Sequence, residues 1–146
     1  MKALKLITTA LILTSCSMLD EDHFDVEDRL KPYVEQFYQE AAARGKKIQH
    51  QNLLVWETYA LSQKGGAAGQ SFPGSIPSVR IASDLLDEGD TLKIKFVVFH
   101  ELGHALLYRG HAGEYDFSIM VPNDYLIGDF KTKPGLRKEL IDELFQ

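Results

Sequence analysis

The chain has 146 residues, of which 45% are hydrophobic and 25% charged, and its formal net charge is −5. Length and composition indicate one globular domain and exclude a disordered tail, a collagen-like fibre and a multi-pass membrane protein. Lysine and arginine form no cluster along the chain, so nucleic acid is not expected as a partner. The single cysteine excludes an internal disulfide and a two-thiol zinc site.

The first sixteen residues have the pattern of a lipoprotein signal. A positively charged start precedes an apolar run over residues 6–13, which is far shorter than the roughly 20 residues that a membrane-spanning helix needs. Residues 13–16, Leu-Thr-Ser-Cys, resemble the lipobox of bacterial lipoproteins, which implies cleavage before Cys16 and a diacylglycerol on its sulfur. We therefore expect residues 1–15 to be a signal peptide, with an ordinary secretory signal and a chance cysteine as the alternative.

Such a signal predicts a protein of the bacterial cell envelope that is anchored to a membrane, the outer membrane above all, and faces the periplasm or the cell surface. Removing residues 1–15 takes away Lys2 and Lys5, which leaves 14 basic residues against 21 acidic ones, a net charge of −7. Residues 16–25 are rich in Asp and Glu and predict a solvated tether. The folded domain is then expected over residues 26–146.

Three segments follow the tether. Apolar residues at helical spacing predict a helix that starts near Asp28 and ends at Gly45, and Pro32 is compatible with this start because the first turn of a helix needs no donor. Residues 52–60 are β-branched and aromatic and predict a strand. Residues 64–78 contain four glycines and two prolines and predict a long loop at the rim of a cleft.

The second half of the chain is expected to hold one more strand and two helices. Residues 79–82 predict a short strand at the edge of the sheet, and residues 84–90 predict an acidic turn. Thr91 is the expected cap of a helix over residues 92–109, and residues 135–145 predict an amphipathic C-terminal helix. Together these elements predict a small α+β domain with a short mixed sheet.

The helix over residues 92–109 contains the motif H-E-x-x-H at positions 100–104. Four residues advance a helix by about 400°, so the imidazoles of His100 and His104 leave the same face and can bind one cation. Glu101 lies beside them, where its carboxylate can reach a zinc-bound water and take the proton as that water attacks a carbonyl. Apolar residues on both sides of the motif predict burial, and a metal ion offsets the cost of burying these polar groups.

A catalytic zinc site commonly has three protein ligands and one open position. The candidates for the third ligand are His111, Glu114 and Asp116. In a continuous helix His111 would lie about 10 Å further along the axis than His104, so the chain must turn back, and Gly110 is the expected stop of the helix. We expect His111 to be the third ligand because imidazole is a favoured ligand of zinc, with Glu114 as the alternative.

These residues resemble the zincin metallopeptidases, and more narrowly the metzincins, which carry H-E-x-x-H-x-x-G-x-x-H followed by a methionine turn. Residues 118–120, Ser-Ile-Met, resemble that turn, and residues 120–122 are similar to its form in matrixins. The resemblance implies a zincin-like fold in which Met120 is a hydrophobic floor beneath the zinc, with ordinary core packing as the alternative role. The chain departs from the pattern at two positions, since Leu107 replaces the glycine and Gly110 replaces the third histidine.

The sequence therefore predicts a membrane-anchored zinc metallopeptidase with His100, His104 and His111 as ligands and Glu101 as the catalytic residue. A peptide or protein substrate is expected to bind as an extended strand at the edge formed by residues 79–82. Two alternatives use the same residues. One is a zinc-binding lipoprotein that acts as a non-catalytic scaffold or binding protein, and the other is an amidase that acts on cell-wall substrates.

Overall fold

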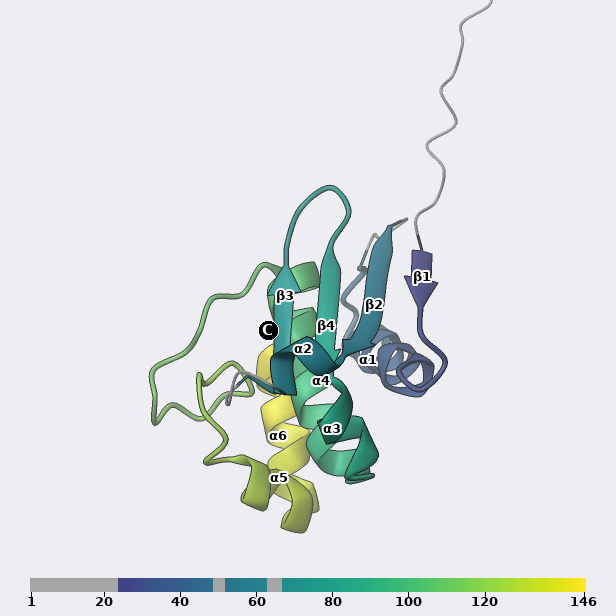
Figure 1. The fold of residues 1–146 in the computed structure, drawn as a ribbon. Coiled ribbons are helices and arrows are strands. Elements are labelled where there is room, and N and C mark those ends of the chain that lie inside the picture. Colours follow the sequence, from purple (N-terminus) through teal and green to yellow (C-terminus); the bar gives the residue numbers. More distant parts are fainter. Residues whose placement is uncertain (1–23, 49–51, 63–66) are drawn as a thin grey trace, which may run out of the picture.

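The computed structural model describes residues 24–48, 52–62 and 67–146 (Figure 1). The predicted signal peptide, Cys16 and all of the tether except its last two residues lie outside these ranges. Within the described ranges, no helix combines the length and the apolar character needed to cross a membrane.

Four strands form one mixed sheet in the order β1-β2-β4-β3 (Figure 1). Three of them are parallel: β1 (Phe24–Val26), β2 (Leu53–Thr58) and β4 (Ser78–Ala82). The fourth, β3 (Gly69–Phe72), pairs antiparallel with β4 and forms one edge. The two predicted strands are thus confirmed, whereas β1 and β3 were not predicted.

Strand β3 corrects two expectations about the sheet. Residues 64–78 were expected to form a loop, but Gly69 pairs with Ile81 and Phe72 pairs with Ser78. As a result β4 lies between two neighbours and is not the edge strand. A segment of Gly, Gln, Ser and Phe has little intrinsic β-propensity. Its pairing with β4, and not the preference of its own residues, therefore makes it a strand.

Two long helices cover one face of the sheet (Figure 1). They are α1 (Lys31–Ala43) and α4 (Thr91–Leu107). The C-terminal helix, α6 (Pro134–Leu144), was predicted and buries Leu140, Ile141 and Leu144. Three short helices complete the fold: α2 (Tyr59–Ser62), α3 (Ser83–Asp87) and α5 (Ile127–Thr132). The fold class is therefore α+β with a small mixed sheet, as the sequence predicts.

Aromatic packing joins the helices behind the sheet. The ring of Phe37 on α1 lies 5.2 Å from the ring of Phe99 on α4 and 5.0 Å from that of Phe145 after α6. All three side chains are buried, and burying an aromatic side chain contributes about 1.5–3 kcal/mol. This cluster fixes α4 between the sheet and the C-terminal helix, and α4 is the helix that carries the motif.

The ends of α4 differ from the prediction. The cap is Asp90 rather than Thr91, because its side chain accepts a hydrogen bond from the amide of Lys93 at 3.1 Å. The helix ends at Leu107, two residues before the expected end at Arg109. The acidic segment before it is partly helical, since Ser83–Asp87 forms α3 where a turn was expected.

Candidate metal centre

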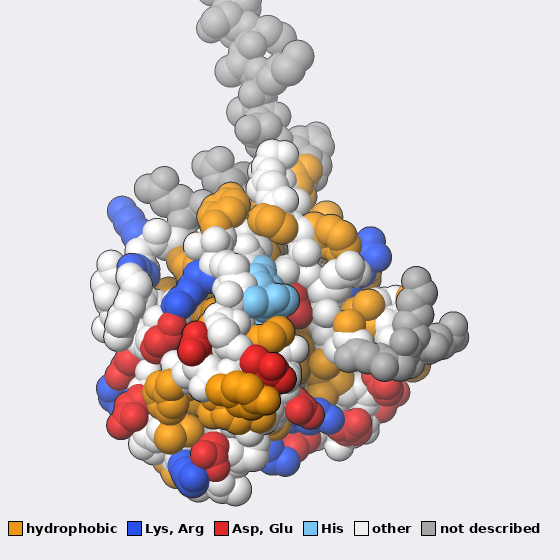
Figure 2. Space-filling model, turned by 90° about the vertical axis from the view of Figure 1, so that its left-hand side faces the viewer, with side chains coloured by type: hydrophobic (Ala, Val, Ile, Leu, Met, Phe, Trp, Pro, Cys, Tyr) orange, Lys and Arg blue, Asp and Glu red, His pale blue; other side chains and the backbone are white. Residues whose placement is uncertain are grey.

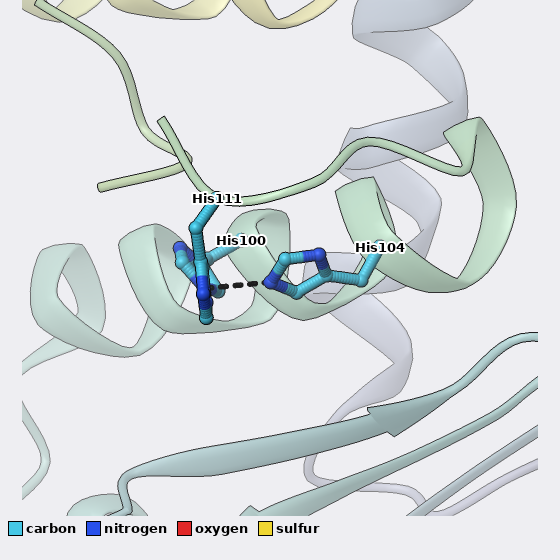
Figure 3. Close-up of side chains that lie close together, drawn as sticks. All are labelled: His100, His104 and His111. Atoms are coloured by element: carbon cyan, nitrogen blue, oxygen red, sulfur yellow. Dashed lines mark hydrogen bonds between the residues drawn. The ribbon is translucent and has the colours of Figure 1, made fainter. Parts of the chain in front are cut away.

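Three histidine side chains converge in the cleft beside α4. The ring centroids of His100 and His104 are 4.7 Å apart. The ring centroid of His111 lies 4.7 Å from that of His104 and 5.3 Å from that of His100. Figure 3 shows the first two rings leaving α4 and the third reaching them from the following loop. One ligand atom from each residue lies within 4.8 Å of the others, so the three histidines can hold a metal ion.

Backbone carbonyls fix the orientation of two of these rings. Nδ1 of His100 lies 2.8 Å from the carbonyl oxygen of Ile119, and Nδ1 of His104 lies 2.6 Å from that of Arg109. A carbonyl oxygen only accepts, so each Nδ1 carries the proton and donates it. In the neutral ring Nε2 is then left with a free lone pair, which is the form that binds a metal.

The two free nitrogens face each other. Nε2 of His104 lies 3.0 Å from Nε2 of His100, and two lone pairs at this distance repel unless a cation lies between them (Figure 3). Two imidazoles of a tetrahedral zinc ion, each at about 2.0–2.1 Å, place their nitrogens about 3.3 Å apart. Burial lowers the pKa of His100 to about 4, and burial lowers the pKa of His104 as well. The donor set therefore fits a zinc ion.

The turn that brings His111 back lies one residue later than in the metzincin pattern. Tyr108 has a left-handed φ of 55°, and its amide and that of Arg109 donate to the carbonyl of Gly103. Gly110, the expected stop, therefore does not end the helix. In the metzincin pattern the third histidine comes three residues after the glycine. Here His111 comes three residues after Tyr108, so the turn and the histidine are both shifted by one residue and keep the same spacing.

Glu101 points from α4 toward β3. The side chain is 7% exposed, and a Cβ atom built on Gly69 would lie 2.6 Å from its Cγ. Burial raises the pKa of Glu101 to about 7, and a hydrogen bond with the side chain of Ser71 opposes this rise. Only glycine at position 69 leaves room for the carboxylate, so β3 decides where Glu101 lies.

A cleft passes through the site on both sides of the histidines. One part, of about 490 Å³, includes Ser71, Tyr108 and His104 in its wall, and the other, of about 670 Å³, includes Phe96 and Val121. Both parts are lined by three shared residues: Gly69, Glu101 and His111. Figure 2 shows the histidines in a hollow near the middle of this face, with hydrophobic side chains above and below them. A chain-like molecule can therefore pass directly over Glu101.

Met120 packs against the backbone of α4 at Gly103. Its side chain is fully buried, and a Cβ atom built on Gly103 would lie 2.6 Å from its Sδ. The amide of Ala112 donates to the Met120 carbonyl at 2.9 Å, which ties the loop that carries His111 to this turn. Met120 thus contacts α4 within the H-E-x-x-H motif and belongs to the apolar core.

Of the other two candidates for the third ligand, Glu114 and Asp116, the second has a partner for its carboxylate, which accepts a hydrogen bond from the amide of Gly113 at 2.7 Å. In the part of the chain that the structure describes, the group of ligand atoms that can hold a metal contains neither carboxylate. The geometry therefore favours the histidine.

Four features of the site were not predicted from the sequence. They are the close approach of Gly69, the side chain of Ser71, and the carbonyls of Arg109 and Ile119. Only the glycine carried a signal, because a glycine within a strand often marks a close contact, but the strand itself was not predicted. The carbonyl partners carry no signal, since every residue has a carbonyl.

The chain matches no protein-family model, no curated protein and no solved structure. The likeness to the metzincins consequently consists of residues 100–120 and their order along the chain.

Proposed function

We propose that the protein is a zinc-dependent peptidase of the zincin type that is attached to a membrane of the cell envelope. The observation that carries this proposal is the convergence of three histidine nitrogens beside a buried glutamate within a cleft. His100, His104 and His111 would hold the zinc ion, and the orientation of the first two by carbonyls supports this role.

When bound, the zinc ion supplies a Lewis acid that polarises the scissile carbonyl and lowers the pKa of water. The protein contributes the proton transfers. Glu101 accepts a proton from the attacking water at its carboxylate and donates it to the nitrogen of the leaving amine. Its burial against Gly69 supports this role, because a fixed carboxylate in a site of restricted solvent access keeps its geometry through the reaction.

The edge of β3 offers a place for an extended substrate. The amide of Ala82 donates to the carbonyl of Ala68, so the antiparallel ladder alternates in a way that turns the backbone groups of Gly69 and Ser71 toward the open edge. A peptide that adds a strand here would run past Glu101. We therefore move the proposed substrate edge from residues 79–82 to β3.

The buried Glu101 favours catalysis over a purely structural zinc site, which has no need for a carboxylate beside its ligands. An amidase that acts on cell-wall cross-links would use the same residues in the same way. Attachment to the membrane is proposed from the lipobox-like residues 13–16 alone, and replacing Cys16 by alanine should release the protein from the membrane fraction.

The test is zinc content and peptide cleavage by the full mature protein, with Glu101→Gln as the variant. We expect about one zinc ion per chain in both proteins. Cleavage of a mixed peptide library should fall about 10²- to 10⁴-fold in the variant, because it lacks the proton acceptor. A protein without zinc after incubation with the metal, or a variant that still cleaves at the normal rate, would contradict the proposal.

A further inference from the structure

Glu143 lies on α6, outside the motif and outside the loop that carries His111, yet it contacts that loop at two places, Arg109 and Ser118. One carboxylate oxygen pairs with the guanidinium of Arg109, and the other accepts a hydrogen bond from the hydroxyl of Ser118 at 2.8 Å. The side chains of Arg109 and Glu143 are 30% and 26% exposed, so the pair is shielded from much of the solvent. One carboxylate therefore holds residues 109 and 118 together.

The first contact leads to His104. The guanidinium of Arg109 also donates to the carbonyls of Glu143 and Leu144, at 2.7 and 3.0 Å, so its side chain is fixed on the end of α6. The backbone carbonyl of the same arginine is the acceptor for Nδ1 of His104. The anchoring of the Arg109 side chain therefore determines the position of the Arg109 carbonyl that accepts from His104.

The second contact leads to His100. The Ser118 hydroxyl donates to Glu143 and accepts from the amide of Met120 at 3.0 Å, so it is satisfied in both directions. Ile119, between these two residues, provides the carbonyl that accepts from Nδ1 of His100. Ser118 is buried, so the loss of the Glu143 carboxylate would leave its hydroxyl proton without an acceptor.

We propose that Glu143 is a positioning residue of the metal centre, which sets through Arg109 and Ser118 the two carbonyls that orient His104 and His100. The inference depends on the proposed function for the identity of the metal. The removal of groups that orient metal ligands costs about 10- to 100-fold in metal affinity, because the ligands must then be ordered when the metal binds.

The experiment compares zinc affinity, measured by competition with a chelator, and the visible spectrum of the cobalt-substituted protein. Glu143→Ala should weaken zinc binding about 10- to 100-fold and change the cobalt spectrum. Glu143→Gln should restore part of the affinity, because its single amide oxygen can still accept a hydrogen bond from one of the two donors, Arg109 or Ser118. An unchanged affinity and spectrum in Glu143→Ala would overturn the inference.

Asp142→Ala is the matched control on the same helix. Asp142 pairs with Arg44 after α1 and with Lys138 on its own helix, so this variant should lose thermal stability without a change in zinc affinity. An equal loss of zinc affinity in this control would show a general effect of destabilising α6 and would also overturn the inference.

A measurement on the metal-free protein separates this inference from the proposed function. Nitrogen-15 NMR of the histidines should show the proton on Nδ1 of His100 and His104 in the wild type, with a mixture of tautomers in Glu143→Ala. If Glu143→Ala does not fold, Ser118→Ala replaces it in this measurement and should change the tautomer of His100 alone. Tautomers that do not change would refute the role of Glu143, whereas a wild type that binds no zinc would refute the proposed metal.

Discussion

Helix α4 and strand β3 line the same cleft, and they hold their residues there in different ways. Ten of the 17 residues of α4 are buried, and the helix presents His100, Glu101 and His104 from a packed core. Strand β3 has four residues, and none of them is fully buried. It contributes the space left by the absence of a side chain at Gly69 and the backbone groups of an open edge. The side chains proposed to bind the metal and transfer protons are therefore on the rigid wall, and the polar backbone proposed to pair with a substrate is on the other.

The largest effect should follow from a change on the helical wall. His104→Ala removes one of the three proposed ligands and the partner of the Arg109 carbonyl, so zinc content should fall to near zero and cleavage with it. Tyr115→Ala, at a side chain that is 80% exposed, is the control and should keep its zinc. A His104→Ala protein that still holds one zinc ion per chain would mean that α4 is not the metal-binding wall.

Gly69→Ala tests the wall formed by β3. The new methyl group would lie 2.6 Å from Cγ of Glu101 and must displace the carboxylate. Cleavage should fall about 100-fold, since an error of about 1 Å in position has this effect, while zinc affinity stays the same. Gly74→Ala, where a Cβ atom meets nothing within 4 Å, is the matched control for kinetics and stability. Normal activity in Gly69→Ala would show that β3 does not position Glu101.

Removal of the proposed zinc ion should destabilise the whole fold, because a metal held by the three histidines would join α4 to the loop after it. A ligand present at 100 times its dissociation constant stabilises the native state by about 2.7 kcal/mol. The melting temperature measured by calorimetry should therefore fall on chelation and rise again when zinc is added. In His104→Ala the melting temperature should not respond to zinc, and a response there would point to a second zinc site.

The smallest effect is expected at the end of α4. Tyr108 is 66% exposed and has a left-handed backbone, which costs a residue other than glycine about 1–2 kcal/mol. Tyr108→Gly removes this strain but adds the entropy of glycine in the unfolded chain, so the free energy of unfolding should rise by at most about 1 kcal/mol. Chemical denaturation measures it, and a clear loss of stability would mean that the tyrosine ring contributes packing.

The parts of the fold that the sequence predicted are those with a strong local pattern. Apolar residues at helical spacing identified α1, α4 and α6, and β-branched runs identified β2 and β4. Strand β3 and helix α3 were not predicted, because Gly69–Phe72 and Ser83–Asp87 have turn-like compositions. Their structures depend on partners in other parts of the chain, which a local pattern does not contain.

For the site, the sequence by itself determined which residues could hold a metal from the helix, because the spacing of His100 and His104 places both imidazoles on one helical face, with Glu101 next to them in the chain, wherever that helix lies. Only the tertiary structure decided what surrounds them: the return of His111 through the turn at Tyr108, the contact of Glu101 with Gly69, and the carbonyls that orient the histidines. The physical reason is the range of the interactions. Helical periodicity is set within a few residues, whereas these contacts form only when α4, β3 and α6 pack together.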